Sequence, residues 1–360
     1  MKKFKIVSIA LLICCILFVI CEGSPVKHVQ QTAKKAAVPA KNLAIEEYKL
    51  FPRDKIYEVD CSEQGGCVPQ VILQKRERWR NVYYPEGWNS FIKPLGYYFV
   101  KEKNGQSHDL YKGSNMVLSH LTHIRAFNMN SSKTRFMFTA DYTYDSYGTD
   151  GHDYQGGGAG IFLDGRFTRS GLAQTVTPMY FLGDQVIKIE LSRKQSFAKH
   201  YQYSGQQYKE ESYEIYLDAS LIYEFSGVNY PSAVLQNFYV FNNEHWVLEY
   251  AKPEINLGKL VGNSGTVVVD GKNLNDKYHY KEMFNYSYVK DDPLFFFRDR
   301  KGVVRISYAG KTLLGSYIEV MHYGVGFYAH LNAIGNNNMI CFYALKDNNL
   351  WYYVEAGIYE

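Results

Sequence analysis

The amino-acid sequence predicts an all-β protein, a β-propeller of six or seven blades built from repeats of about 40–54 residues. Short aromatic and β-branched runs alternate with turns rich in Gly, Asn and Asp, and long helical periodicity is absent. The 33 Tyr residues also suit strands, since a Tyr ring packs well on a pleated surface. The third observation is that the strongest strands end at regular intervals.

The spacing of these strand ends is the main evidence for repeats. Seven strong strands, each ending in an acidic residue or its substitute, lead to positions 61, 113, 165, 219, 271, 310 and 356. The intervals are 52, 52, 54, 52, 39 and 46 residues. A unit of this length with three or four strands is typical of a propeller blade, which buries its faces by stacking on its neighbours in a ring. A series of β-sandwich domains is the alternative, but it does not explain the spacing.

The clearest repeat unit has an aromatic strand, a turn and then strand-Asp-Gly-Lys-x-Leu. It occurs as Asp270-Gly271-Lys272 with Leu274, and in part as Gly310-Lys311 with Leu313. This pattern resembles bacterial propeller repeats of the TolB or WG-repeat kind. The resemblance covers two units well and implies a binding or scaffolding platform more often than an enzyme. Residues 43–360 are expected to form the repeat domain, with the strands near Leu43–Asp60 completing the last blade.

The N-terminal segment predicts export. A basic start is followed by a mostly apolar run of 15 residues, Ile6–Ile20, which has the length of a signal-peptide core and is short for a membrane span. We expect residues 1–23 to be a signal peptide cleaved after Gly23. Lipoprotein processing at Cys21 and an uncleaved membrane anchor are the alternatives. Each of the three places the body outside the cytoplasm: secreted, periplasmic or associated with the cell envelope.

Charge and cysteine content limit the partners and the compartment. Residues 24–42 contain four lysines and no acidic residue, so they are expected to be a flexible tether. The net charge of the whole chain is +4, which leaves the folded body close to neutral and without the basic face that nucleic-acid binding needs. Cys61 and Cys67 close a short polar loop, and in an oxidising compartment they are expected to form a disulfide, with a two-Cys metal site as the alternative.

One segment interrupts the repeats and is the candidate site. The Gly-rich loop from Asp141 to Gly158 carries Asp141, Asp145, Asp150, His152 and Asp153. A long solvated hairpin loop is the ordinary interpretation. Carboxylates and flexible glycines also suit a Ca²⁺ ion, which takes six to eight oxygen ligands, although the spacing does not match a known Ca²⁺ loop. No cofactor is expected otherwise.

The remaining polar motifs are less specific. His120 and His123 would point to opposite faces of a regular strand, so one metal ion would not bridge them easily. Asn130 and Asn285 each begin an Asn-x-Ser glycosylation pattern. The elbow of serine hydrolases, the zinc-protease motif, the phosphate-binding loop and a paired Cys-x-x-Cys are all missing.

The sequence therefore predicts a secreted or envelope-tethered binding platform that is not an enzyme and that binds a protein or a glycan. Contact with a membrane would occur only through the N-terminal segment. The alternative is an extracellular carbohydrate-active enzyme that uses the carboxylates of the Asp141–Asp153 loop as acid and base.

Overall fold

The structure is a computed structural model. It describes residues 44–52, 85–103, 105–142, 158–170, 178–192, 200–203, 206–229, 233–257, 259–289, 291–322, 334–336 and 339–357. The predicted signal peptide, the tether and the Cys61–Cys67 loop lie outside these residues. None of the helices in the described ranges has the length and apolar character that a membrane crossing needs.

The described residues confirm an all-β chain, and they divide into two compact units. The first unit contains the described residues of 85–129 and 135–170, and the second contains 44–52, 130–134 and those from 178 onward. Among the strands of the described residues, all pairings but one are antiparallel, and the exception is a single parallel bridge between β10 and β15. Closure of the sheets into a propeller ring stays a prediction.

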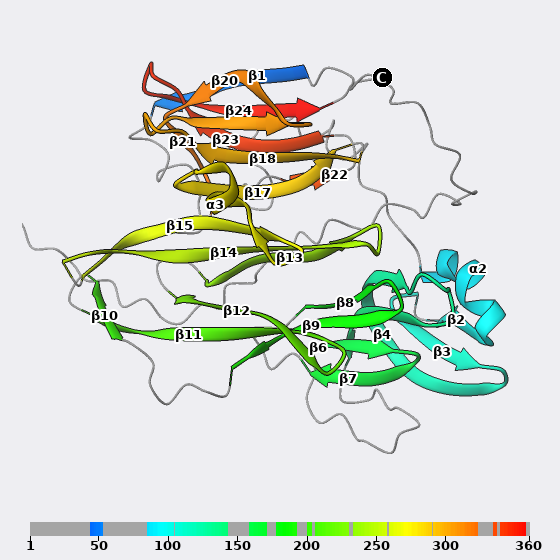
Figure 1. The fold of residues 1–360 in the computed structure, drawn as a ribbon. Coiled ribbons are helices and arrows are strands. Elements are labelled where there is room, and N and C mark those ends of the chain that lie inside the picture. Colours follow the sequence, from blue (N-terminus) through cyan, green and yellow to red (C-terminus); the bar gives the residue numbers. More distant parts are fainter. Residues whose placement is uncertain are drawn as a thin grey trace, which may run out of the picture. The chain divides into compact units, whose positions relative to one another are not determined.

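The first unit is a six-stranded sheet preceded by short helical turns (Figure 1). Its strands follow in sequence order. The elements are η2 (Pro85–Trp88), α2 (Asn89–Ile92), η3 (Lys93–Leu95), β2 (Tyr97–Lys101), β3 (His108–Lys112), β4 (Asn115–Met129), β5 (Phe136–Tyr142), β6 (Gly158–Leu163) and β7 (Arg166–Ser170). Its core is aromatic: Phe99 meets Phe138 edge to face at 5.2 Å between ring centroids, and Phe138 stacks on Phe162 at 5.1 Å.

The second unit contains sheets of nine, four and five strands. The nine-stranded sheet has β8 (Met179–Leu182), β9 (Gln185–Leu191), β10 (His200–Tyr203), β11 (Gln206–Leu217), β12 (Ser220–Val228), β13 (Leu235–Phe241), β14 (His245–Asn256), β15 (Lys259–Val269) and β16 (Lys272–Asn273). The helix α3 (Leu274–Tyr278) leads to the four-stranded sheet, β17 (Glu282–Val289), β18 (Asp292–Arg298), β19 (Val304–Tyr308) and β20 (Lys311–Tyr317). The five-stranded sheet has β1 (Ala44–Pro52), β21 (Glu319–Val320), β22 (Ile334–Asn336), β23 (Met339–Leu345) and β24 (Leu350–Gly357).

Three hydrophobic cores hold the second unit together: the first lies within the nine-stranded sheet, and the other two join different sheets. Ile189 of β9 and Ile215 of β11 share a core with Trp246 of β14. Val267 of β15 packs in a second core with residues of β17 and β18. Phe296 of β18 packs in a third core with residues of β23 and β24. Val268 lies in the first core and Val267 in the second, so β15 is covered on both faces, which explains why Val267–Val268–Val269 is apolar without alternation.

The same hairpin turn recurs in three of the four sheets and in both units. Its first residue has a positive φ of 49–58° and donates its backbone N–H to a carbonyl oxygen near the start of another strand, at 2.7–3.1 Å. These first residues are Gly113, Asp164, Asp218, Asp270 and Ala309. Four of the strand ends noted in the sequence, 165, 219, 271 and 310, are the second residue of such a turn. Residue 113 is the first residue of its turn, and residue 356 lies within β24.

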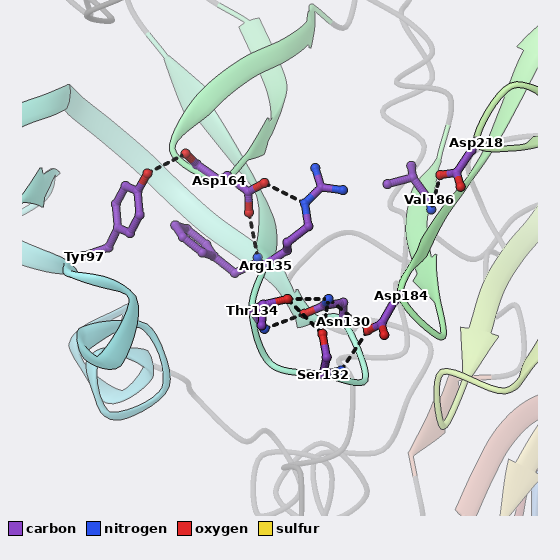
Figure 2. Close-up of polar contacts among 10 residues, drawn as sticks. Tyr97, Asn130, Ser132, Thr134, Arg135, Asp164, Asp184, Val186 and Asp218 are labelled. Carbon is purple, nitrogen blue, oxygen red and sulfur yellow. Dashed lines mark hydrogen bonds and ion pairs between the residues drawn. The ribbon is translucent and has the colours of Figure 1, made fainter.

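Aspartate at the first turn position adds a side-chain clamp (Figure 2). Asp164 accepts hydrogen bonds from the Phe136 backbone N–H at 3.0 Å and from the Arg135 side chain at 2.8 Å. In the second unit, Asp218 accepts from the backbone N–H of Val186 at 2.9 Å, and Asp270 accepts in the same way from Trp246 at 2.9 Å. The acidic residue at the strand end is therefore a structural residue that ties a turn to another strand.

The N-terminal strand completes the sheet at the C-terminal end of the chain. β1 pairs antiparallel with β24, with Ala44 opposite Gly357 and Tyr48 opposite Tyr353. Tyr317 donates to Glu47 of β1 at 3.0 Å, which ties this strand to β20 as well. The sequence expectation was that strands near Leu43–Asp60 complete the last blade; the described strand, β1, joins the sheet of β24, and its place in a ring stays a prediction.

Candidate functional site

Of the residues predicted to form a site in the Gly-rich loop, the structure describes Asp141. It lies on β5, where its carboxylate pairs with His123 at 2.9 Å and with Arg125 at 3.6 Å. His123 is 74% exposed and Asp141 is 34% exposed, so this is a surface ion pair of small energetic weight. Asp145, Asp150, His152 and Asp153 lie outside the described residues.

In the strand β4 the backbone conformation repeats every three residues. His120, His123 and Ala126 all have positive φ, between 46° and 55°. Against β5, the paired residues of β4 are spaced by three while their partners are spaced by two: Thr122, Arg125 and Asn128 face Asp141, Thr139 and Met137. Each step therefore contains a β-bulge, in which an extra residue is inserted into one strand.

This bulged geometry changes what the two histidines can do. Leu118 and Leu121 are three residues apart, yet both are buried, at 2% and 1% exposure. Residues three apart therefore share a face of β4, and the rule of alternating faces does not apply to His120 and His123. Each of the two rings contacts a carboxylate through its Nδ1 atom.

The His120 contact belongs to a three-residue cluster in which Glu102 follows the end of β2, Asp109 lies at the start of β3 and His120 lies within β4. His120 Nδ1 lies 2.7 Å from Glu102 Oε1, and the His120 backbone N–H donates to Asp109 at 3.1 Å. One ligand atom from each of the three side chains lies within 4.8 Å of the other two. The Glu102 side chain is 16% exposed and that of His120 is 43% exposed, so the cluster is partly covered but open to solvent.

The two carboxylates of this cluster titrate in opposite directions. Burial alone would raise the pKa of Glu102, but hydrogen bonds from Ser107 and His120 and the charge of His120 lower it below its usual value. Burial raises the pKa of Asp109 and the adjacent Glu102 charge adds to this effect, against the backbone hydrogen bond from His120. Glu102 is therefore the ionised partner, and Asp109 holds a proton more strongly.

A second polar site lies in the second unit, where the β14–β15 hairpin meets β17 and β18. A cavity of about 150 Å³ is lined by Glu254, Asn263, Lys281, Glu282 and Arg298. All five side chains are polar, and four of them carry charge. Lys281 pairs with Glu254 at 3.1 Å, and Arg298 pairs with Glu282 at 2.7 Å. The charges therefore balance across the cavity.

Glu282 is the most strongly perturbed carboxylate of this site. Its Oε2 accepts from Arg298 Nε at 2.7 Å, and its Oε1 lies 3.1 Å from His322 Nε2. Burial would raise the pKa of Glu282, but the hydrogen bond and charge of His322 and the charge of Arg298 lower it to about 2. The carboxylate stays ionised at neutral pH with both oxygens engaged, so it is a poor proton donor and a weak base.

The partners of Glu282 are themselves fixed. The His322 ring stacks on Phe284 with 3.6 Å between centroids and an interplanar angle of 8°. Its Nδ1 donates to the Val320 carbonyl oxygen at 2.7 Å. Arg298 donates to the backbone carbonyl of Gly302 at 2.8 Å. This rigid set of donors and acceptors can hold a polar ligand without rearranging.

Sequence reasoning noted His120, His123 and Asp141 but did not predict that either histidine pairs with a carboxylate, and it did not single out Glu102 or Glu282. Glu282, Arg298 and His322 come from separate segments, so no short spacing could indicate that they meet. The Glu102 cluster depends on the pairing of β3 with β4, in which Leu110 faces Leu118. A usable signal was present in β4, whose apolar residues recur every third position as Leu118, Leu121, Ile124 and Phe127.

Comparison with known proteins gives little similarity. No protein-family model matches the chain, and no curated protein matches it either. Among solved structures, the crystal structure of the polysaccharide lyase Uly1 aligns with a TM-score of 0.26 and 10% sequence identity. The alignment covers 69% of this chain and 59% of the lyase, so the chain spans somewhat more than half of that protein's length.

Proposed function

We propose that this protein is a secreted or envelope-tethered binding platform, and that it binds a glycan without cleaving it. The observation that carries the proposal is the cavity lined by Glu254, Asn263, Lys281, Glu282 and Arg298. Sugar hydroxyls both donate and accept hydrogen bonds, so they match a site that holds carboxylate, amide, ammonium and guanidinium groups in fixed positions.

The size and position of the cavity support a glycan over a protein partner. A volume of about 150 Å³ has room for about five water molecules or one sugar ring, and none of the five lining side chains is apolar. The core of a protein interface is depleted of charged residues and enriched in aromatic residues. The lining of this cavity is the opposite, with four charged side chains and no aromatic one. Four of the lining residues lie on strands of two packed sheets and Lys281 directly precedes β17, and a rigid scaffold of this kind favours recognition over induced closure.

A propeller ring is the proposed architecture of this platform. The recurrent turn that begins at Gly113, Asp164, Asp218, Asp270 and Ala309 supports it, because equivalent turns at similar steps are expected of repeated blades. β1 supplies the outer strand next to β24, as expected where the first and last parts of a ring join. A low-resolution shape measurement by X-ray scattering would test this, since a closed disc and an open stack of sheets differ in radius of gyration.

The chemistry of the described carboxylates supports binding over hydrolysis. Glycosidases use two carboxyl groups about 5–10 Å apart, one of which holds a proton near neutral pH. Glu282 is ionised at neutral pH, and Glu102 and Asp109 contact each other directly. The enzyme alternative uses the carboxylates of the Asp141–Asp153 loop. The one that the structure describes, Asp141, is in an ion pair with His123.

Binding and cleavage can be separated in one experiment. The purified protein is passed over immobilised neutral and acidic polysaccharides, and the bound fraction is compared with that of Asn263→Ala and Lys281→Ala. The matched control is Lys252→Ala, an exposed lysine of β14 outside the lining set. We expect both cavity variants to lose at least about tenfold in affinity while the control keeps it.

The soluble products are analysed in parallel. Release of oligosaccharides from any polysaccharide, abolished by Asp145→Asn or Asp150→Asn, would contradict the non-catalytic proposal and favour the enzyme. Binding that is retained in both cavity variants would place the glycan site elsewhere and reject the cavity.

A further inference from the structure

The cluster of Glu102, Asp109 and His120 has the composition of a metal site in the first unit. It joins two carboxylates and one imidazole, and the three ligand atoms lie within 4.8 Å of one another. Around a first-row divalent ion, metal–ligand distances near 2.0–2.2 Å place neighbouring ligand atoms roughly 3.4 Å apart. His120 Nδ1 and Glu102 Oε1 are already at 2.7 Å, so small side-chain rotations reach that spacing.

The ligands are held by other groups, as expected of a metal site. Ser107 donates a hydrogen bond to Glu102. The His120 backbone N–H donates to Asp109 at 3.1 Å. Such outer contacts fix the orientation of ligating side chains and are commonly needed for tight binding. The 43% exposure of the His120 side chain leaves a route for the ion and positions for water or an external ligand.

The bulges of β4 explain why the histidine can take part. His120 lies at a bulge between Leu118, which pairs with Leu110, and Leu121, which pairs with His108. Its positive φ of 55° directs the backbone N–H toward Asp109 while Nδ1 contacts Glu102. His123 repeats this backbone geometry three residues later, but its Nδ1 contacts a single carboxylate, that of Asp141.

We propose that Glu102, Asp109 and His120 bind a first-row divalent transition metal ion, of the Zn²⁺ or Mn²⁺ type. Imidazole nitrogen is a ligand that these ions accept readily, whereas Ca²⁺ prefers six to eight oxygen ligands. Three protein ligands leave at least one coordination position for water or an external oxygen donor. This site is separate in sequence from the Asp141–Gly158 loop, and it does not depend on the proposed glycan cavity.

Isothermal titration calorimetry with ZnCl₂ tests the proposal on the purified full-length chain after treatment with a chelator. We expect one equivalent of Zn²⁺ to bind at micromolar or lower concentration. His120→Ala and Asp109→Asn should each weaken this binding by about tenfold or more, since each removes a ligand. Millimolar Ca²⁺ should not displace the Zn²⁺.

His123→Ala is the matched control because His123 has the same strand, the same positive φ and a carboxylate partner of its own. We expect it to bind Zn²⁺ as the unmodified chain does. Far-UV circular dichroism of each metal-free variant checks folding, and Asp109→Asn is included because it conserves side-chain volume. Wild-type protein that binds no stoichiometric Zn²⁺ would overturn the proposal. So would binding that survives His120→Ala and Asp109→Asn, an equal loss in His123→Ala, or full displacement by Ca²⁺.

Discussion

Replacing Glu282 by Gln is expected to destabilise the second unit by an amount that depends on pH. Gln keeps the volume and the hydrogen-bonding oxygen of the side chain but removes the negative charge. Arg298 and His322 would then face a neutral amide in a largely buried position, with Glu282 only 8% exposed and His322 12% exposed. A buried charge that loses its partner is a large source of instability.

The magnitude follows from the pKa of Glu282. Its ordinary value is 4.5, and the folded protein lowers it to about 2. A shift of one pKa unit corresponds to about 1.4 kcal/mol, so the ionised form contributes roughly 3 kcal/mol to the free energy of unfolding at neutral pH. The same range, about 3–5 kcal/mol, is typical when one member of a buried ion pair is removed.

The pH dependence has a definite sign. The folded-state pKa is below the unfolded-state pKa, so the stabilisation is fully present above pH 4.5 and is lost as the pH falls toward 2. The difference in unfolding free energy between the wild type and Glu282→Gln should therefore be constant at neutral pH. It should shrink to about half near pH 3 and vanish close to pH 2.

Urea unfolding followed by tryptophan fluorescence measures this difference at each pH. Trp246 and Trp351 are both buried in the second unit and report on its unfolding. Glu254→Gln is the matched control: its carboxylate pairs with Lys281, which is 72% exposed, so its loss should cost less than about 1 kcal/mol at any pH. A Glu282→Gln effect that is equally small, or that stays constant down to pH 2, would refute the reasoning.

Three further predictions concern the fold. Asp218→Ala should lower the free energy of unfolding by about 1–2 kcal/mol in thermal unfolding, because the Val186 N–H loses its acceptor; an unchanged stability would show that the clamp is redundant. Gly227→Ala should cost about 1–3 kcal/mol, since the new Cβ would lie 2.7 Å from the Ala251 carbonyl oxygen; a stability equal to wild type would contradict this close approach. Asn130, which is 3% exposed and whose side-chain amide has three acceptors, should carry no glycan in the folded protein from a glycosylating host, and mass spectrometry of tryptic peptides would detect one if present.

Much of the secondary structure could be predicted from local sequence. The two-residue turns at Asp164-Gly165 and Asp270-Gly271 were readable because positive φ at both positions strongly favours these residues. The final strand end at residue 356 fits no turn, since β24 is followed in its sheet by β1, from the opposite end of the chain. The recurrent turn therefore occurs at residues 113, 164, 218, 270 and 309, and the described residues of the last, five-stranded sheet contain no equivalent of it.

The candidate sites were harder to predict because they depend on contacts between distant segments. Four strands, β18 to β21, lie between Glu282 and His322 in the sequence, so a local motif carries no information on their meeting. The opposite-face argument for His120 and His123 was sound for a regular strand and did not apply here because of the bulges. The apolar period of three in β4 was visible in the sequence, and it would have indicated that residues three apart share a face.

The pairing of β1 with β24 also has a kinetic consequence. During synthesis, β1 is complete long before its partner exists, so its backbone N–H and C=O groups must remain solvated or be shielded until the last strand emerges. Strand pairing between the two ends of a chain is slow to form, and an unpaired strand edge invites association with other chains. A chain shortened by its last eight described residues, those of β24, would leave both β1 and β23 without their common neighbour. Aggregation is then the expected outcome, because every earlier sheet could fold while this last edge stayed open.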